Sequence, residues 1–272
     1  MNLKLLTIIN KPVNKPVNKP VNKPVNKPVN KQINNPINNP INNPRINFIT
    51  LTNSGYIDYT LNCLKSLENI QSKINLHCYC IGKDGYQKLI EKGYQTTLID
   101  EEENNNFAKF GHDNFSNITF NKFKIIYDNL LTYDYVCFTD GDIVYEKNNF
   151  MDYLLINIGN NDMLIQNDTM NDNSSGQLCS GFIFIRSNQN TIDLFNPINM
   201  EKDKNSPDWN DQVYINNIKN KLKFIKLPLN LFPNGKYYYN HSNLNPYLIH
   251  FNWIIGHDKM LKMKQYNKWY LS

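Results

Sequence analysis

The sequence has no long hydrophobic run, and this absence excludes a membrane-spanning protein. Its N-terminal apolar stretch, residues 3–9, is far shorter than the roughly 20 residues that a transmembrane helix needs, and Lys4 interrupts it. The stretch also lacks the longer apolar core and the small-residue cleavage site of a secretory signal. We therefore expect no transmembrane segment and a soluble, cytoplasmic protein that is not secreted.

Cysteine is scarce and odd in number, which argues against a disulfide framework. Most of the 5 cysteines lie in apolar runs, so we expect buried free thiols in a reducing compartment. Cys78 and Cys80 would face the same side of a strand, but no other Cys or His stands at zinc-ligand spacing. A zinc site is therefore not expected.

The N-terminal segment contains no Asp or Glu, and this changes the meaning of the net charge of +5. Of the 29 basic residues, eight lie in residues 1–45, which leaves 21 against 24 acidic residues, or a net charge of about −3, for the remainder. The positive charge thus belongs to the N-terminal segment. The body offers no basic cleft, and we expect no nucleic-acid partner.

Regularly spaced prolines set residues 1–44 apart from the rest of the chain. A Lys-Pro-Val-Asn repeat runs from Lys11 to Asn30 and then degrades, and 8 of the 13 prolines lie in this segment. Proline at every fourth position prevents a continuous backbone hydrogen-bond ladder. We predict a disordered, solvated tail over residues 1–44 and one folded domain over residues 45–272, whereas the sequence gives no indication of an oligomeric state.

The body reads as alternating strands and helices, which is typical of an α/β fold of the Rossmann-like kind. Strands are predicted at residues 45–52, 75–81, 96–99, 136–138, 162–166, 180–186 and 248–250. Helices are predicted from Asp58, at residues 86–92, 118–131 and 150–158, and from Pro207, with loops over residues 101–117 and 167–177. The turn after the first strand has no Gly-x-Gly-x-x-Gly and no P-loop lysine, so neither NAD nor a P-loop nucleotide is expected.

Two aspartates follow the short apolar run at residues 136–138, which has the pattern of a strand buried on both faces. In parallel sheets, ligands bind beyond the carboxyl ends of such strands. Asp140 and Asp142 would meet there, and two carboxylates so close together hold a divalent cation more readily than they tolerate each other. Gly141 between them would let the backbone approach a ligand. Taken alone, the tripeptide also fits an ordinary turn.

Three other positions carry candidate chemistry. His250 ends a predicted strand and precedes Gly256 and Lys259, so it could complete an oxygen-rich cation site while the lysine neutralises phosphate; a hydrogen-bonded core histidine is the alternative. Lys122 either reaches nucleotide phosphates or belongs to a solvated helix face. Asp211 lies near a helix start, where the helix dipole favours a carboxylate, although that does not account for the Gln that follows it.

Together these motifs resemble the nucleotide-diphospho-sugar transferase family, which comprises retaining glycosyltransferases of the GT-A fold. The resemblance covers residues 46–271 and is carried by motifs at residues 138–144, 166–168, 180–187, 211–212, 227–235 and 250–259. It implies a mixed, mostly parallel sheet flanked by helices. It also implies transfer of a sugar from a nucleotide-diphospho-sugar, a UDP-sugar, to a hydroxyl of a glycan or protein acceptor with retention of configuration.

The resemblance also assigns roles to individual residues. The metal, Mn²⁺ or Mg²⁺, would be bound by Asp140, Asp142 and His250. The donor nucleotide and its diphosphate would be bound by Thr50, Leu51, Thr52, Asn53, Lys122, Asp140, Gly141, Gly256 and Lys259. The sugar pocket, and with it catalysis, would fall to Asp168, Asp211 and Gln212.

Two other functions stay open at this point. A transferase-like domain without activity would act as a tail-tethered binding or scaffold module. A metal-dependent phosphatase would need an aspartate nucleophile just after the first strand, where the sequence has residues 50–53, Thr-Leu-Thr-Asn. The excess of Asn, Ile and Lys is typical of an AT-rich genome, and a large DNA virus is one hypothesis for the source, which would place the protein in the host cytoplasm or the virion.

Overall fold

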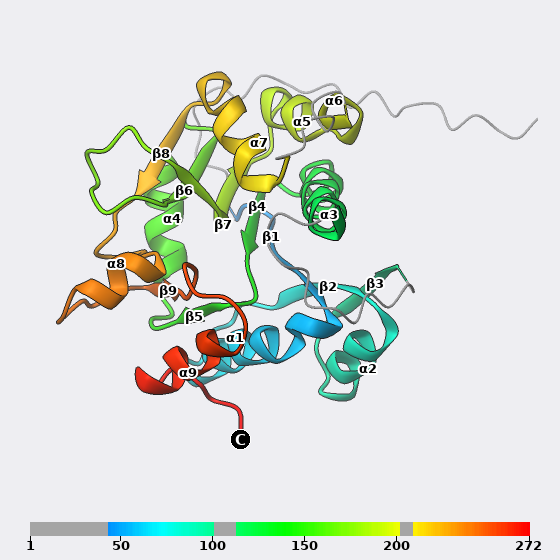
Figure 1. Cartoon of the computed structure of the whole chain (residues 1–272). Helices are drawn as coiled ribbons and strands as arrows, with labels where there is room; N and C mark the ends of the chain where they lie inside the picture. Colours follow the sequence, from blue (N-terminus) through cyan, green and yellow to red (C-terminus); the bar gives the residue numbers. More distant parts are fainter. Residues whose placement is uncertain (1–42, 101–112, 202–208) are drawn as a thin grey trace, which may run out of the picture. The chain divides into compact units, whose positions relative to one another are not determined.

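The computed structural model describes residues 43–100, 113–201 and 209–272 (Figure 1). Nearly all of the predicted tail over residues 1–44, and most of the predicted loop over residues 101–117, lie outside the described residues. The boundary between tail and folded domain therefore stays a prediction.

A seven-stranded sheet forms the centre of the fold, in the order β3-β2-β1-β4-β7-β6-β8. Strand β7 runs antiparallel to both of its neighbours, whereas the other pairings are parallel. The strands are β1 (Ile46–Asn53), β2 (Leu76–Ile81), β3 (Thr96–Asp100), β4 (Tyr135–Thr139), β6 (Met163–Asn167), β7 (Leu178–Arg186) and β8 (Phe224–Leu227). The predicted mixed, mostly parallel sheet is confirmed.

Helices cover both faces of this sheet because side chains alternate along each strand. In β4, Tyr135 and Cys137 belong to the core on one face, and Val136 and Phe138 to the core on the other. The first face is covered by α1 (Ile57–Asn69), α2 (Lys83–Glu91) and α4 (Phe150–Ile158). The second face is covered by α3 (Asp113–Leu130), α5 (Gln189–Phe195), α6 (Pro197–Glu201) and α7 (Asp211–Ile218).

A second, two-stranded sheet pairs segments that are far apart in the sequence. Strand β5 (Ile143–Tyr145) follows the Asp-Gly-Asp turn and runs antiparallel to β9 (Leu248–His250). The flanking helices are α8 (Gly235–Asn240) and α9 (His257–Gln265). Because Ile143 lies opposite His250, this register places the histidine beside the aspartate that precedes Ile143.

Most of the predicted strands and helices are present, but three predicted helix starts are wrong by three residues or more. Helix α2 begins at Lys83, directly after Gly82, and not at residue 86. Helix α3 begins at Asp113 and not at residue 118, because Phe115 continues the helical spacing of apolar residues that the polar composition concealed. Helix α7 begins at Asp211 and not at Pro207, which lies outside the described residues. The side chain of Asn210 caps it by accepting a hydrogen bond from the backbone N–H of Val213 at 2.9 Å.

The elements β5, β8, α5, α6, α8 and α9 were not predicted, since most are too short to show a clear hydrophobic period. All five cysteines are buried and free, as predicted. Within the three described segments, no helix combines the length and apolar character required to cross a membrane.

Phe150 anchors α4 to the sheet and offers a test of this packing. Its ring is fully buried, 6.1 Å from that of Phe48 and 4.9 Å from that of Tyr145 between centroids. We expect Phe150→Ala to lower the free energy of unfolding by about 3–5 kcal/mol, because it leaves a cavity in the core. Ile156→Ala, at a 77% exposed position of the same helix, should change it by about 0.5 kcal/mol or less. Equal midpoints in urea denaturation for the two variants would contradict this packing.

Candidate active site

The turn between β4 and β5 fixes the two aspartates at the carboxyl edge of the main sheet. The backbone N–H of Asp140 donates to the carbonyl of Gly181 in β7 at 2.7 Å, and that of Ile143 donates to the carbonyl of Asp140 at 3.3 Å. The side chain of Asp140 is 34% exposed, whereas that of Asp142 is buried at 4%. One carboxylate thus faces solvent and the other faces the interior.

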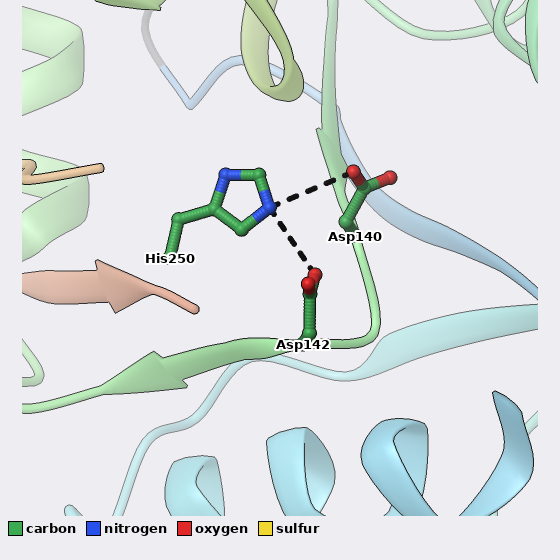
Figure 2. A group of neighbouring side chains, drawn as sticks. All are labelled: Asp140, Asp142 and His250. Carbon is green, nitrogen blue, oxygen red and sulfur yellow. Dashed lines mark ion pairs between the residues drawn. The ribbon is translucent and has the colours of Figure 1, made fainter. Parts of the chain in front are cut away.

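The pairing of β5 with β9 brings His250 to these carboxylates (Figure 2). Its Nε2 lies 3.2 Å from Asp142 Oδ1 and 3.8 Å from Asp140 Oδ2. One potential ligand atom from each residue falls within 4.8 Å of the others. Two carboxylates and an imidazole are a donor set that suits Mn²⁺, so this cluster could hold a divalent cation.

Gly181 leaves the space that this cluster needs. A Cβ atom at this position would lie 2.2 Å from His250 Cε1 and 2.7 Å from Asp140 Oδ2, so any larger residue would collide with both. A glycine in this strand therefore lets the imidazole and the carboxylate approach the backbone closely. A Cβ atom on Gly141 would lie 2.4 Å from Thr60 Oγ1 of α1, so this glycine lets the Asp-Gly-Asp turn pack on the helix.

Gln166, which was not predicted as a site residue, orients the imidazole. Its Oε1 lies 2.7 Å from His250 Nδ1, while its Nε2 donates to the carbonyls of Phe232 and Pro233 at 3.2 and 3.1 Å. Because the amide nitrogen is engaged by carbonyls, the oxygen must accept from Nδ1–H. In the neutral ring the lone pair is then on Nε2, which faces the two carboxylates.

Lys259 enters the same cluster from α9. Its ammonium group contacts Asp142 Oδ2 and the hydroxyl of Tyr56, and the Tyr56 hydroxyl itself donates to Asp142 Oδ2 at 3.1 Å. Gly256 caps the helix with φ of 63°, and its carbonyl accepts a hydrogen bond from the Tyr59 hydroxyl at 2.9 Å. The C-terminal segment is thereby tied to α1 next to the aspartates. Tyr56 was also not predicted, because a tyrosine in a turn carries no distinctive pattern.

The charges in this cluster shift one another's pKa values. Burial opposes ionisation of Asp142, but Lys259 and His250 hold its pKa well below the ordinary value. Burial alone would lower the pKa of His250, yet Asp142 and Cys179 raise it well above the usual range. Burial raises the pKa of Asp140. Asp142 is thus ionised and available as a ligand, whereas His250 would have to give up a proton to hold a cation.

Lys122 joins this cluster to the start of α7. Its Nζ lies 3.2 Å from Asp140 Oδ1, 2.7 Å from Asp211 Oδ2 and 3.4 Å from Ser180 Oγ. Ser180 Oγ also donates to Asp211 Oδ2 at 2.7 Å. Burial disfavours the charged form of Asp211, but Lys122 lowers its pKa below the ordinary value. The solvated-face interpretation of Lys122 is wrong, since the residue is 4% exposed, and its contact with a nucleotide stays a prediction.

Asp168 and Gln212 meet beyond the end of β6. Gln212 Nε2 donates to Asp168 Oδ2 at 2.9 Å, and Asp168 Oδ1 accepts from Asn252 Nδ2 at 3.2 Å and from Trp253 Nε1 at 3.0 Å. Two of the three residues predicted to line the sugar pocket are therefore joined to each other, and Asp168 is joined to the segment that follows His250. The roles of Asn252 and Trp253 were missed, although both lie in one of the motifs that carry the family resemblance.

Residues 50–53, predicted as a nucleotide-binding turn, are the last four residues of strand β1 and not a turn. They lie at the carboxyl end of β1, next to β4. Thr50, Thr52 and Asn53 are buried, while Leu51 is half-buried. Thr50 Oγ1 and Asn53 Oδ1 have no hydrogen-bond partner among the described residues. Buried polar atoms are normally satisfied, so these two atoms fit a strand end that receives polar groups of a ligand.

Comparison with known proteins identifies the family. Residues 80–265, more than half of the chain, match the sequence model of nucleotide-diphospho-sugar transferases. The chain therefore belongs to the nucleotide-diphospho-sugar transferase family. The family expected from the motifs is thus confirmed.

One curated relative is the UDP-galactose:fucoside alpha-3-galactosyltransferase of Dictyostelium discoideum. It is 28% identical over 290 residues, which cover 82% of this chain and 43% of the relative. The chain thus spans about two-fifths of that protein's length.

Solved structures confirm the GT-A fold. The galactosyltransferase LgtC in complex with donor and acceptor sugar analogues is 15% identical with a TM-score of 0.51 and covers 74% of this chain and 86% of its own. The apo-form glycosyltransferase GlyE of Streptococcus pneumoniae is 14% identical with a TM-score of 0.57, and the match covers 85% of this chain and 61% of GlyE. A glycosyltransferase involved in glycosylation of the major capsid of PBCV-1 is 11% identical with a TM-score of 0.51, and the match covers 82% of this chain and 100% of that protein.

Because Lys122 forms a buried ion pair with Asp211, we expect its replacement to destabilise the protein far more than replacement of an exposed lysine of the same helix. We expect Lys122→Ala to cost about 3–5 kcal/mol of stability, because Asp211 is left buried without its cation. Lys124→Ala, at an exposed position of α3, should cost about 0.5 kcal/mol or less. Urea denaturation at neutral pH measures both, and equal losses would contradict the pairing.

The stability difference between the wild type and Lys122→Ala should depend on pH in a definite direction. The pKa of Asp211 is lower in the folded protein than in the unfolded chain. The ionised carboxylate therefore contributes to the free energy of unfolding above the unfolded pKa, and this contribution is lost as the pH falls towards the folded pKa. The gap between wild type and Lys122→Ala should therefore shrink below about pH 4. A gap that stays constant from pH 7 to about pH 3 would contradict this assignment.

Proposed function

We propose that this protein transfers a sugar from a UDP-sugar to an acceptor hydroxyl with retention of configuration, using Mn²⁺ or Mg²⁺. The observation that carries the proposal is the convergence of Asp140, Asp142 and His250 from distant parts of the chain, with Lys259 beside them. The resemblance of the motifs to the GT-A family and the name of the Dictyostelium relative support a UDP donor, and the latter makes galactose the first sugar to test.

In this proposal Asp142, Asp140 and His250 bind the cation. When bound, the cation neutralises charge that develops on the departing diphosphate. Gln166, by its contact with Nδ1 of His250, would keep Nε2 available as a ligand atom, and the low pKa of Asp142 would keep this carboxylate ionised. Lys259 would leave Asp142 for the diphosphate, where its charge favours the transition state more than the ground state.

The donor would extend from this cluster in two directions. Thr50, Leu51, Thr52 and Asn53 would bind the nucleoside, which supplies partners for Thr50 Oγ1 and Asn53 Oδ1. The sugar would extend the other way, towards Asp211 and the pair formed by Asp168 and Gln212. Lys122, between Asp140 and Asp211, would lie close to both the phosphate and the sugar.

Retention requires either a nucleophile on the far face of the sugar or attack of the acceptor on the face from which the diphosphate leaves. Nε2 of Gln212 is engaged by Asp168, so Oε1 is the atom that we place against the sugar. In the same-face reaction the acceptor oxygen bonds to the anomeric carbon and the bond to the diphosphate breaks with its electron pair. The acceptor proton then passes to the departing diphosphate oxygen.

A thermal-shift experiment tests the metal and donor site together. We expect UDP with Mn²⁺ to raise the melting temperature of the wild type, because a bound ligand stabilises the folded state. Asp142→Asn should lose this shift and the Mn²⁺-dependent hydrolysis of UDP-galactose while it keeps the circular dichroism spectrum. Asp152→Asn, at an exposed acidic position of α4, is the matched control and should behave as the wild type. If no UDP- or GDP-sugar shifts the wild type, the inactive scaffold becomes the better interpretation.

Retention has its own test. With UDP-α-galactose as donor, proton NMR of the first product formed should show an α-linked galactose. A β-linked product would show inversion and would remove the proposed role of Gln212. The result does not depend on which glycan serves as acceptor.

A further inference from the structure

An exposed tryptophan stands at the sugar end of the site. Trp253 follows His250 by three residues and is 55% exposed, whereas Trp209 is 3% exposed. Its Nε1 donates to Asp168 Oδ1 at 3.0 Å, and Lys236 Nζ lies 4.9 Å from the centroid of its ring. The polar edge of the indole is thus bound to the protein, while much of the residue stays open to solvent.

The backbone of Trp253 is strained to hold the ring there. Its φ is 66°, in the left-handed region that bulky side chains avoid. The other described non-glycine residues with positive φ carry amide side chains, namely Asn43, Gln71, Asn243 and Asn267. Such strain persists at ligand sites, where the surrounding structure enforces it. The preceding residue, Asn252, is held by two hydrogen bonds: its Oδ1 accepts from the N–H of Gly235 at 2.7 Å, and its Nδ2 donates to Asp168.

Asp168 couples this tryptophan to the pocket proposed for the donor sugar. One oxygen of the carboxylate accepts from Trp253, and the other accepts from Nε2 of Gln212 at 2.9 Å. A ligand that touches the indole is therefore within one residue of the amide that we place against the sugar. Asp168 acts here as a positioning residue.

The strand order shows on which side of the aspartates Trp253 lies. The segment proposed to bind the nucleotide ends β1, and Asp168 follows β6, which is separated from β1 by β4 and β7. Three strand spacings amount to about 14 Å, so Trp253 lies on the far side of the aspartates from the nucleoside. We therefore place an acceptor sugar beside the donor sugar at this end of the site, away from the nucleoside.

We propose that Trp253 is the platform for a sugar ring of a glycan acceptor. The face of a pyranose that carries only C–H bonds packs well on an aromatic ring, while its hydroxyls can bond to a nearby polar group such as the Lys236 ammonium. This inference rests on the proposed function and makes it more specific: the acceptor is a glycan and not a bare protein side chain.

Binding of simple sugars without a donor tests the platform directly. Saturation-transfer NMR would be recorded for the wild type with the methyl glycosides of fucose, galactose, glucose and N-acetylglucosamine. We expect at least one to bind. Trp253→Ala should weaken that binding about tenfold, whereas Trp253→Phe, which keeps a ring but loses the Nε1 hydrogen bond, should weaken it by about threefold or less. Ile156→Ala, an exposed apolar position on α4, should leave it unchanged.

The UDP and Mn²⁺ thermal shift, measured on the same proteins, separates this inference from the proposed function. It should be equal in the wild type and in both Trp253 variants. The platform is refuted if no glycoside binds a wild type that does respond to UDP, or if Trp253→Ala binds the glycoside as tightly as the wild type. It is also refuted if Trp253→Ala loses the UDP shift, because Trp253 then supports the donor pocket. A wild type that ignores UDP but binds glycosides through Trp253 would refute the donor proposal alone.

Discussion

The antiparallel pairing of β5 with β9 is the constraint on which the site depends. It joins the strand that follows Asp142 to the strand that ends in His250, more than a hundred residues later in the chain, and it sets the register so that Ile143 faces His250. A slip of one residue would turn the imidazole to the other side of the small sheet. The contacts of Gly181 and Gln166 with His250 support the same register from the main sheet.

Charge compensation explains how so many ionisable groups are buried at one edge of the sheet. Asp142 is compensated by Lys259 and His250, and Asp211 by Lys122 and Ser180. Buried ion pairs contribute little net stability, but removal of one partner leaves a charge without compensation. The arrangement therefore fits a site that exchanges partners during function, with a cation and a diphosphate in place of internal contacts, better than one selected for stability.

The site has an order along the sheet edge that follows the strand order. The segment proposed to bind the nucleotide ends β1, the aspartates follow β4, and the pair proposed to face the sugar, Asp168 and Gln212, lies beyond β6. The segment after β9 runs across this order, since Lys259 reaches Asp142 and Trp253 reaches Asp168. One C-terminal segment thus contributes to both the diphosphate end and the acceptor end of the proposed site.

The sequence by itself determined the α/β class, most of the strands and helices of the main sheet, and the family. These features are encoded locally, in apolar runs such as residues 136–138 and in motifs such as Asp140-Gly141-Asp142. The tertiary structure alone decided which polar residues meet. A glutamine in an apolar strand such as Gln166, a tyrosine in a turn such as Tyr56, and a tryptophan such as Trp253 have no pattern that reveals their partners. Their contacts arise from β-strand pairing between distant segments, and short elements such as β5 leave no periodicity from which that pairing could be read.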